Sequence, residues 1–182
     1  MFRIATALLL TSTLAVTAET RTVEDEHGTL NPQDTGFGRV MRNIDRGVTD
    51  MATCANGYHI TKAGRHAAAR QLFEACAAAG YTGAMTWMSQ LDNNGLGGDY
   101  NPDRAANWDK RAADLGDPVG KFNYGLDLMR GHGVPRDEDL GRAYVDAAAK
   151  DGLTIARRLQ GADYDLDEVT PDADNWKYAP LF

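Results

Sequence analysis

Serine is almost absent from this sequence. Ser12 lies in an N-terminal apolar run, and beyond that run the chain contains a single serine, Ser89. The chain has neither a Gly-x-Ser-x-Gly elbow nor a Ser-x-x-Lys pair, the two patterns that position a nucleophilic serine. Carboxylates are plentiful, but no pair is marked for acid–base work. The sequence therefore predicts a protein that is not an enzyme.

Metal-binding patterns are also missing. The spacing of the four histidines does not fit a zinc site; they are His27, His59, His66 and His132. Residues 92–99 superficially resemble a calcium loop, but Leu96 offers no side-chain oxygen at the fifth position. The twelfth position is Asp103 rather than glutamate. We expect neither a metal nor another cofactor.

Basic residues are outnumbered, with 19 Lys and Arg against 26 Asp and Glu and a net charge of −7. Such a chain repels nucleic acid and anionic lipid surfaces, so neither is an expected partner. An acidic surface instead favours a basic partner protein.

The N-terminus has the pattern of an export signal. Arg3 precedes an apolar run, Ile4 to Val16, and Val16-Thr-Ala18 is a small-residue cleavage site. We expect a signal peptide over residues 1–18, cleaved after Ala18, and a periplasmic or secreted protein. No cysteine lies near the cut, so a lipid anchor is not expected. Residues 19–36 are polar and acidic and are expected to form a flexible arm.

Residues 80–152 contain one pattern twice, shifted by 36 residues without a gap. Gly80-Tyr-Thr-Gly corresponds to Gly116-Asp-Pro-Val, and Ala105-Ala-Asn-Trp corresponds to Gly141-Arg-Ala-Tyr. A period in this range is typical of stacked helical repeats. Apolar spacing, glycines and prolines predict helices over residues 37–55, 63–78, 84–93, 102–115, 118–129, 138–150 and from 153 onward.

The second-helix pattern beginning at Arg104 and the loop Gly131-His-Gly-Val-Pro-Arg-Asp resemble the Sel-one-like repeat, a relative of the tetratricopeptide repeat. Asp117 to Gly152 fits best, while Ser89 and Gly98 depart from the family's glycine and loop valine. The resemblance implies an all-α fold, a right-handed α/α solenoid of about three helical hairpins over residues 37–160. It also implies a concave face that binds other proteins.

The two cysteines are expected to bond. Small residues lie 23 positions apart in both clear repeats, from Ser89 to Ala112 and from Gly125 to Ala148. Cys54 and Cys76 are 22 apart, so a loop one residue shorter would give Cys54 the place of Ser89. A Cys54–Cys76 disulfide would then staple the first hairpin. A redox pair is the alternative, but no Cys-x-x-Cys spacing supports it.

The first helices of the repeats are expected to line the inner face. Their candidate protein-binding residues are Thr86, Gln90, Asn93, Asn94, Phe122, Leu126, Met129 and Arg130. Aromatic, Met and Arg side chains are favoured at interface centres. The alternative is that Phe122 and Leu126 pack between neighbouring helices. Trp87 and Trp108 are expected in the core.

The last segment, residues 161–182, is acidic and then aromatic, and is expected to cap the end of the solenoid.

Together these features predict an exported, non-catalytic interaction module. It would be an adaptor or accessory subunit of a cell-envelope complex, docking on the periplasmic side of an inner-membrane assembly. An envelope hydrolase acting on cell-wall or β-lactam compounds is the alternative.

Overall fold

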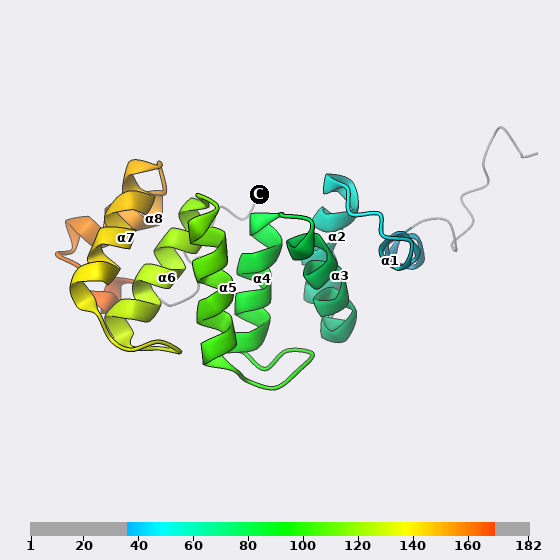
Figure 1. Ribbon diagram of the computed structural model, residues 1–182, viewed down its shortest axis with the longest axis horizontal. Helices are drawn as coiled ribbons and strands as arrows, with labels where there is room; N and C mark the ends of the chain where they lie inside the picture. Colours follow the sequence, from blue (N-terminus) through cyan, green and yellow to red (C-terminus); the bar gives the residue numbers. More distant parts are fainter. Residues whose placement is uncertain (1–35, 170–182) are drawn as a thin grey trace, which may run out of the picture. The chain divides into compact units, whose positions relative to one another are not determined.

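The structure is a computed structural model, and it describes residues 36–169. These residues form α-helices and one short 3-10 helix, with no strand among them (Figure 1). The helices are α1 (Phe37–Asp45), α2 (Met51–Lys62), α3 (His66–Ala78), α4 (Thr82–Asn93), α5 (Pro102–Asp114), α6 (Pro118–Arg130), α7 (Glu138–Lys150), α8 (Thr154–Gly161) and η1 (Leu166–Glu168).

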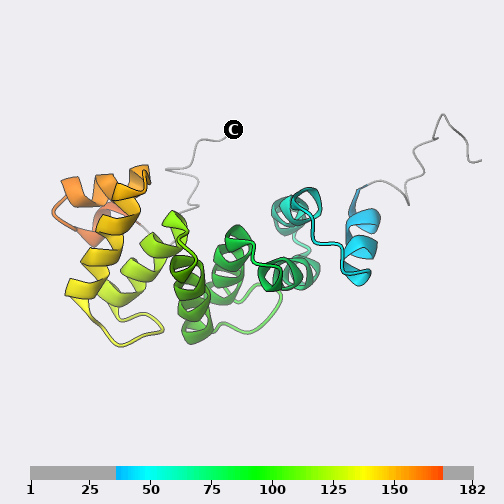
Figure 2. The same ribbon diagram turned by 45° about the horizontal axis from the view of Figure 1, so that its top comes forward.

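From α2 to α8 each helix packs against the next, and α4 also contacts α6, as Figures 1 and 2 show. Three hairpins follow, α2–α3, α4–α5 and α6–α7, with α8 packed on the last. One hairpin has an apolar face too small to fold alone, and stacking makes a continuous core. The predicted all-α solenoid is confirmed, while the predicted signal peptide, most of the arm and Trp176 to Phe182 lie outside the described residues.

Side-chain caps mark the starts of α5, α6 and α7. Asp117 accepts hydrogen bonds from the backbone N–H groups of Val119 and Gly120 at the start of α6. Asn101 and Asp137 cap α5 and α7 in the same way. Caps of this kind satisfy donors that have no partner inside the helix. These helices match the predicted ranges to within two residues.

The single helix predicted over residues 37–55 is wrong. The chain leaves α1 at Arg46, and Gly47 takes a positive φ of 75°. Asp50 then caps a new helix by accepting a hydrogen bond from Thr53 N at 2.7 Å. That helix, α2, continues through Gly57, where the predicted helix was to have stopped. The close approach of α3 requires a glycine at this helical position, because a Cβ at residue 57 would lie 2.3 Å from the Phe73 ring.

The register proposed for the first hairpin is wrong too, although its disulfide is confirmed. The loop between the paired helices has three residues in the first hairpin, 63–65, against eight in the second, 94–101, and seven in the third, 131–137. Gly57, Ser89 and Gly125 are the close-contact residues, where each first helix approaches its partner helix. The first loop is therefore about four residues shorter rather than one. Cys54 corresponds to Thr86 and Phe122, each three residues before the close-contact residue.

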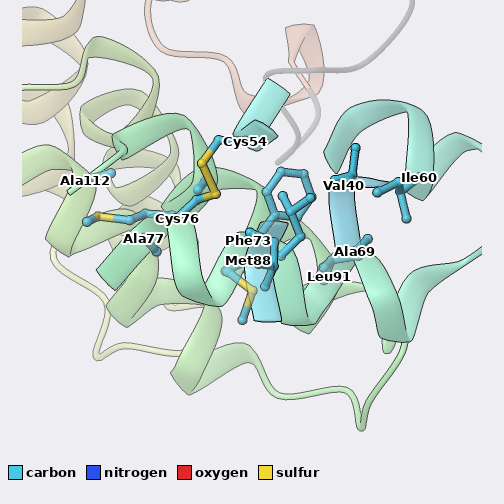
Figure 3. Close-up of a cluster of buried hydrophobic side chains, with 14 residues drawn as sticks. Val40, Cys54, Ile60, Ala69, Phe73, Cys76, Ala77, Met88, Leu91 and Ala112 are labelled. Carbon is cyan, nitrogen blue, oxygen red and sulfur yellow. A yellow bond between two sulfur atoms is a disulfide. The ribbon is translucent and has the colours of Figure 1, made fainter. Parts of the chain in front are cut away.

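The core has two apolar clusters. The first joins α1 to α5 and contains Phe73, Met88 and Leu91 together with the disulfide-bonded Cys54 and Cys76 (Figure 3). The second joins α6, α7 and α8 around Phe122, Leu126, Met129 and Val145. Residues 162–169 follow α8, and we call them the strap. Val169 of the strap is buried in the second cluster, with Tyr164 and Leu166 packed against it.

Candidate protein-binding site

A groove of about 310 Å³ lies where α2, α3 and α4 meet. We call it the aromatic groove; its lining residues are Met51, Cys54, Ala55, Tyr58, Phe73, Tyr81, Gly83, Ala84 and Trp87. None of these lining residues, all within the described part of the chain, carries a charge. In a chain with a net charge of −7, such a surface is a local exception.

Ring contacts hold the floor and one wall of the aromatic groove. Trp87 stacks on Phe73 with ring centroids 5.6 Å apart and an interplanar angle of 2°. Tyr58 meets Trp87 edge to face at 5.7 Å. Because the rings are fixed against the core, they offer apolar area to a ligand at little entropic cost.

Two large apolar side chains at the groove are open to solvent. Met51 is 74% exposed and Tyr58 is 46% exposed. Lys62 Nζ lies over the Tyr58 ring, 5.5 Å from its centroid. Met and Tyr are enriched at the centres of protein interfaces. The exposed Met51 and Tyr58 beside rigid rings therefore suit a protein or peptide ligand.

The disulfide forms part of this wall. Cys54 and Cys76 are bonded with their Cα atoms 5.9 Å apart, and both side chains are buried. The bond joins the start of α2 to the end of α3, and Cys54 itself lines the groove. It therefore fixes α2, the helix that carries the two exposed groove residues, to the core.

The predicted inner-face residues have two different outcomes. Phe122 and Leu126 are fully buried and Met129 is 1% exposed, so the packing alternative describes them. Thr86 is buried as well. For Phe122, Leu126 and Met129 the covering residues come from α7, α8 and the strap. The binding role of these four residues stays a prediction.

The polar members of the predicted set remain partly accessible, but they hold local structure. Arg130 Nη2 donates to the carbonyl oxygens of Leu166 and Val169, at 3.3 and 3.0 Å. Asn94 donates to the carbonyl of Gln90 at 2.8 Å. Asn93 Oδ1 lies 2.9 Å from His132 Nε2, which ties one repeat loop to the next. Their binding role stays a prediction.

Sequence reasoning missed the groove. The helix predicted over residues 37–55 contains Met51 and ends before Tyr58. The helix break at Gly47 moves both residues onto a new helix. The Asp50-x-x-Thr53 capping pattern was the available signal, because Asp before a run of helix formers commonly starts a helix. Trp87 and Trp108 pack against the first cluster but are only partly buried, and Trp87 also lines the aromatic groove.

Two carboxyl groups are buried between the second and third hairpins. Asp109 accepts a hydrogen bond from Ser89 Oγ and one from Asn123 Nδ2 at 3.3 Å. Burial and the nearby Asp127 hold the pKa of Asp109 well above its ordinary value. Burial raises the pKa of Asp127 to about 7, against the opposing charge of Arg130. Ser89 is itself 2% exposed, so its hydroxyl is not presented to a substrate.

A third buried carboxylate, Asp92, is ion-paired. Arg70 Nη1 and Arg104 Nε each donate to it at 2.7 Å. Burial acts to raise the pKa of Asp92, but the hydrogen bonds and charges of Arg104 and Arg70 outweigh it, and the pKa is lowered. This cluster joins α3, α4 and α5 and acts as a structural clamp.

Metal and membrane features are not found in the described part of the chain. Residues 36–169 contain no group of three His, Cys, Asp or Glu side chains placed to hold a metal ion. No helix within the same range combines the length and hydropathy needed to cross a bilayer.

Three solved structures share this fold. A Sel1 repeat protein from Oxalobacter formigenes has a TM-score of 0.57 and 23% identity, over 68% of this chain and 96% of that one. Helicobacter pylori cysteine rich protein B has a TM-score of 0.57 and 16% identity, over 70% and 98%. An SLR-fold protective antigen of uropathogenic Escherichia coli has a TM-score of 0.55 and 18% identity. The match to the antigen covers 74% of this chain and 31% of that one.

These likenesses define the class of protein. The chain has the Sel1-like repeat fold, as its repeat pattern predicted. The sequence itself matches no protein-family model and no curated protein.

Proposed function

We propose that this protein is an exported, non-catalytic adaptor that binds another protein through the aromatic groove. The observation that carries the proposal is the pair of exposed side chains, Met51 and Tyr58, on a rigid aromatic floor. Groups of this kind supply most of the binding energy at protein interfaces when a partner excludes water from them.

Three further observations support export and a partner in the cell envelope. The apolar run Ile4 to Val16 has the form of a secretion signal. The Cys54–Cys76 disulfide suits an oxidising compartment. Helical-repeat solenoids commonly present extended surfaces to partners. The finer role is an accessory or scaffold subunit on the periplasmic side of an inner-membrane complex.

The partner is expected to contribute an apolar side chain or segment to the groove. The lining residues are uncharged, so this central contact is hydrophobic. The acidic residues elsewhere favour a partner with basic groups around that apolar centre. Charge pairs at the rim of the interface would then increase the association rate more than the affinity.

The test is recovery of the native complex. The tagged protein is expressed from its own locus, membranes are solubilised gently, and copurifying proteins are identified. We expect one membrane complex in fixed ratio, and we expect Tyr58→Ala to lose it. Leu140→Ala is the matched control, because Leu140 is also exposed, at 44%, but lies on α7. Recovery of a free monomer only would contradict the adaptor role.

A further inference from the structure

The aromatic groove has a counterpart in the last hairpin, and that counterpart is filled. Cys54 and Tyr58 of α2 correspond to Phe122 and Leu126 of α6, because each pair flanks the close-contact glycine in the same way. Phe122 and Leu126 are fully buried in the cluster that includes α8 and Val169 of the strap. The same face of the first helix is thus covered in one hairpin and open in the other.

The strap ends on the side of the first helices. Arg130, the last residue of α6, donates to the carbonyl oxygen of Val169 at 3.0 Å. His132, just after α6, lies 2.9 Å from Asn93, the last residue of α4. Val169 is therefore linked through the C-terminal end of α6 to the C-terminal end of α4.

The rest of the chain is long enough to reach the aromatic groove. From Asn93 back to Ala84 the helix rises about 14 Å, at about 1.5 Å per residue. Neighbouring helices add about 10 Å each in the lateral direction. Seven extended residues span about 23 Å and thirteen about 43 Å. Residues from Trp176 onward can therefore lie in the groove, with residues 170–175 as the connection.

The composition of that segment matches the groove. Residues 176–182 read Trp-Lys-Tyr-Ala-Pro-Leu-Phe, with four large apolar or aromatic side chains and one charge. The groove is lined by aromatic and apolar groups and is uncharged. Because segment and groove belong to one chain, association does not pay the entropy of bringing two molecules together.

We infer that Trp176–Phe182 binds the chain's own aromatic groove and occupies it when no partner is present. Leu166 and Val169 of the strap pack on the cluster that contains α6. In this proposal, Trp176–Phe182 covers the equivalent surface of α2 in the same way. A partner then competes with this internal segment. The apparent affinity for the partner equals the intrinsic affinity multiplied by the fraction of molecules in which the groove is open. This inference uses the groove of the proposed function, but it does not require that a partner exists.

The test follows the Met51 methyl group in the Glu19–Phe182 protein, with methyl-labelled methionine and a soluble paramagnetic chelate. In the Glu19–Phe182 protein the segment shields Met51 from the chelate. We expect the paramagnetic relaxation rate of the Met51 methyl group to be at least threefold higher in a protein that ends at Val169. Met88, which is 3% exposed, is the internal control and stays unchanged. Adding the peptide Trp176–Phe182 should restore the shielding, and Tyr58→Ala should prevent the restoration.

A second variant guards against misfolding of the shortened chain. The full-length triple variant Trp176→Ala, Leu181→Ala and Phe182→Ala should expose Met51 to the same extent. Equal relaxation of Met51 in all three proteins overturns the inference. Shielding that disappears on dilution also overturns it, because a second copy would then supply the segment. Loss of the partner complex with shielding intact would instead contradict the proposed function alone.

Discussion

The first and last hairpins solve the same packing problem with different chemistry. At equivalent places, the α2–α3 hairpin has Cys54 and Tyr58 and the α6–α7 hairpin has Phe122 and Leu126. The last hairpin buries these side chains under α8 and Val169, whereas the first leaves Tyr58 half exposed. A disulfide joins the helices of the first hairpin, whereas the helices of the last are joined by packing and by an ion pair from Lys121 to Asp151. A covalent bond lets the first hairpin keep an apolar surface open.

The largest expected difference between the two hairpins is in core truncation. Leu126→Ala should lower the free energy of unfolding by about 2–5 kcal/mol, because it leaves a cavity in a fully buried site. Tyr58→Ala, at the equivalent position, should cost less than about 1 kcal/mol, because Tyr58 is half exposed. Urea denaturation measures both. Equal losses would remove the basis of the comparison.

A second expected effect concerns pH and Asp127. The folded protein raises the pKa of Asp127 to about 7, so this group binds a proton more tightly folded than unfolded. Its contribution to stability is complete below about pH 4 and is lost as the pH rises to about 7.

The variant Asp127→Asn isolates this contribution. The free energy of unfolding of the variant, relative to wild type, should rise between pH 4 and pH 7 by up to about 4 kcal/mol. Other groups titrate in both proteins, so the difference between the two curves is the readout. Asp163→Asn, at an exposed site of the strap, is the control for the loss of one carboxyl group. A pH-independent difference would show that Asp127 has an ordinary pKa.

Removal of the disulfide should affect the first hairpin selectively. The double variant Cys54→Ser, Cys76→Ser should lose about 2–4 kcal/mol of stability. Amide hydrogen exchange should accelerate in α2 and α3 and change little in α6 and α7. Uniform acceleration along the solenoid would indicate that the hairpins unfold as one unit.

The smallest expected effect tests the corrected register. Gly57→Ala should cost about 1–3 kcal/mol, because a Cβ there would lie 2.3 Å from the Phe73 ring. Gly83→Ala is the matched control: no atom lies within 4 Å of its Cβ position, and alanine should stabilise α4 slightly. A neutral Gly57→Ala in thermal denaturation would show that α2 packs at another register.

Most of the fold could be predicted from the sequence, because the residues that repeat every 36 positions are those that start and end the helices of each unit. Gly80, Gly116 and Gly152 end the second helices with positive φ values of 92° to 103°. Prolines and capping residues mark the starts of α5 and α6. The first hairpin departs from the period. The apolar spacing from Phe37 to Ala52 predicts one continuous helix there, although the helix breaks at Gly47.

The site was harder to predict than the fold. Exposure depends on what covers a helix face, and the apolar spacing of Phe122 and Leu126 is the same whether that face is open or covered. Residues of α8 and Val169, which lie further along the chain, cover this face of α6. In the same way, the local sequence around Tyr58 does not show that this side chain is left exposed. The disulfide pairing was correct because Cys54 and Cys76 are the only two cysteines, although the register used to justify it was not.

The most direct test of the account is site-specific photo-crosslinking in intact cells. A photoreactive phenylalanine analogue replaces Met51 at the aromatic groove in one strain and Leu140 on α7 in another. Both positions are exposed, so neither replacement should disturb the core. The account predicts an adduct with one partner protein from position 51 and none from position 140. Adducts from position 140 alone, or equally from both, would contradict it.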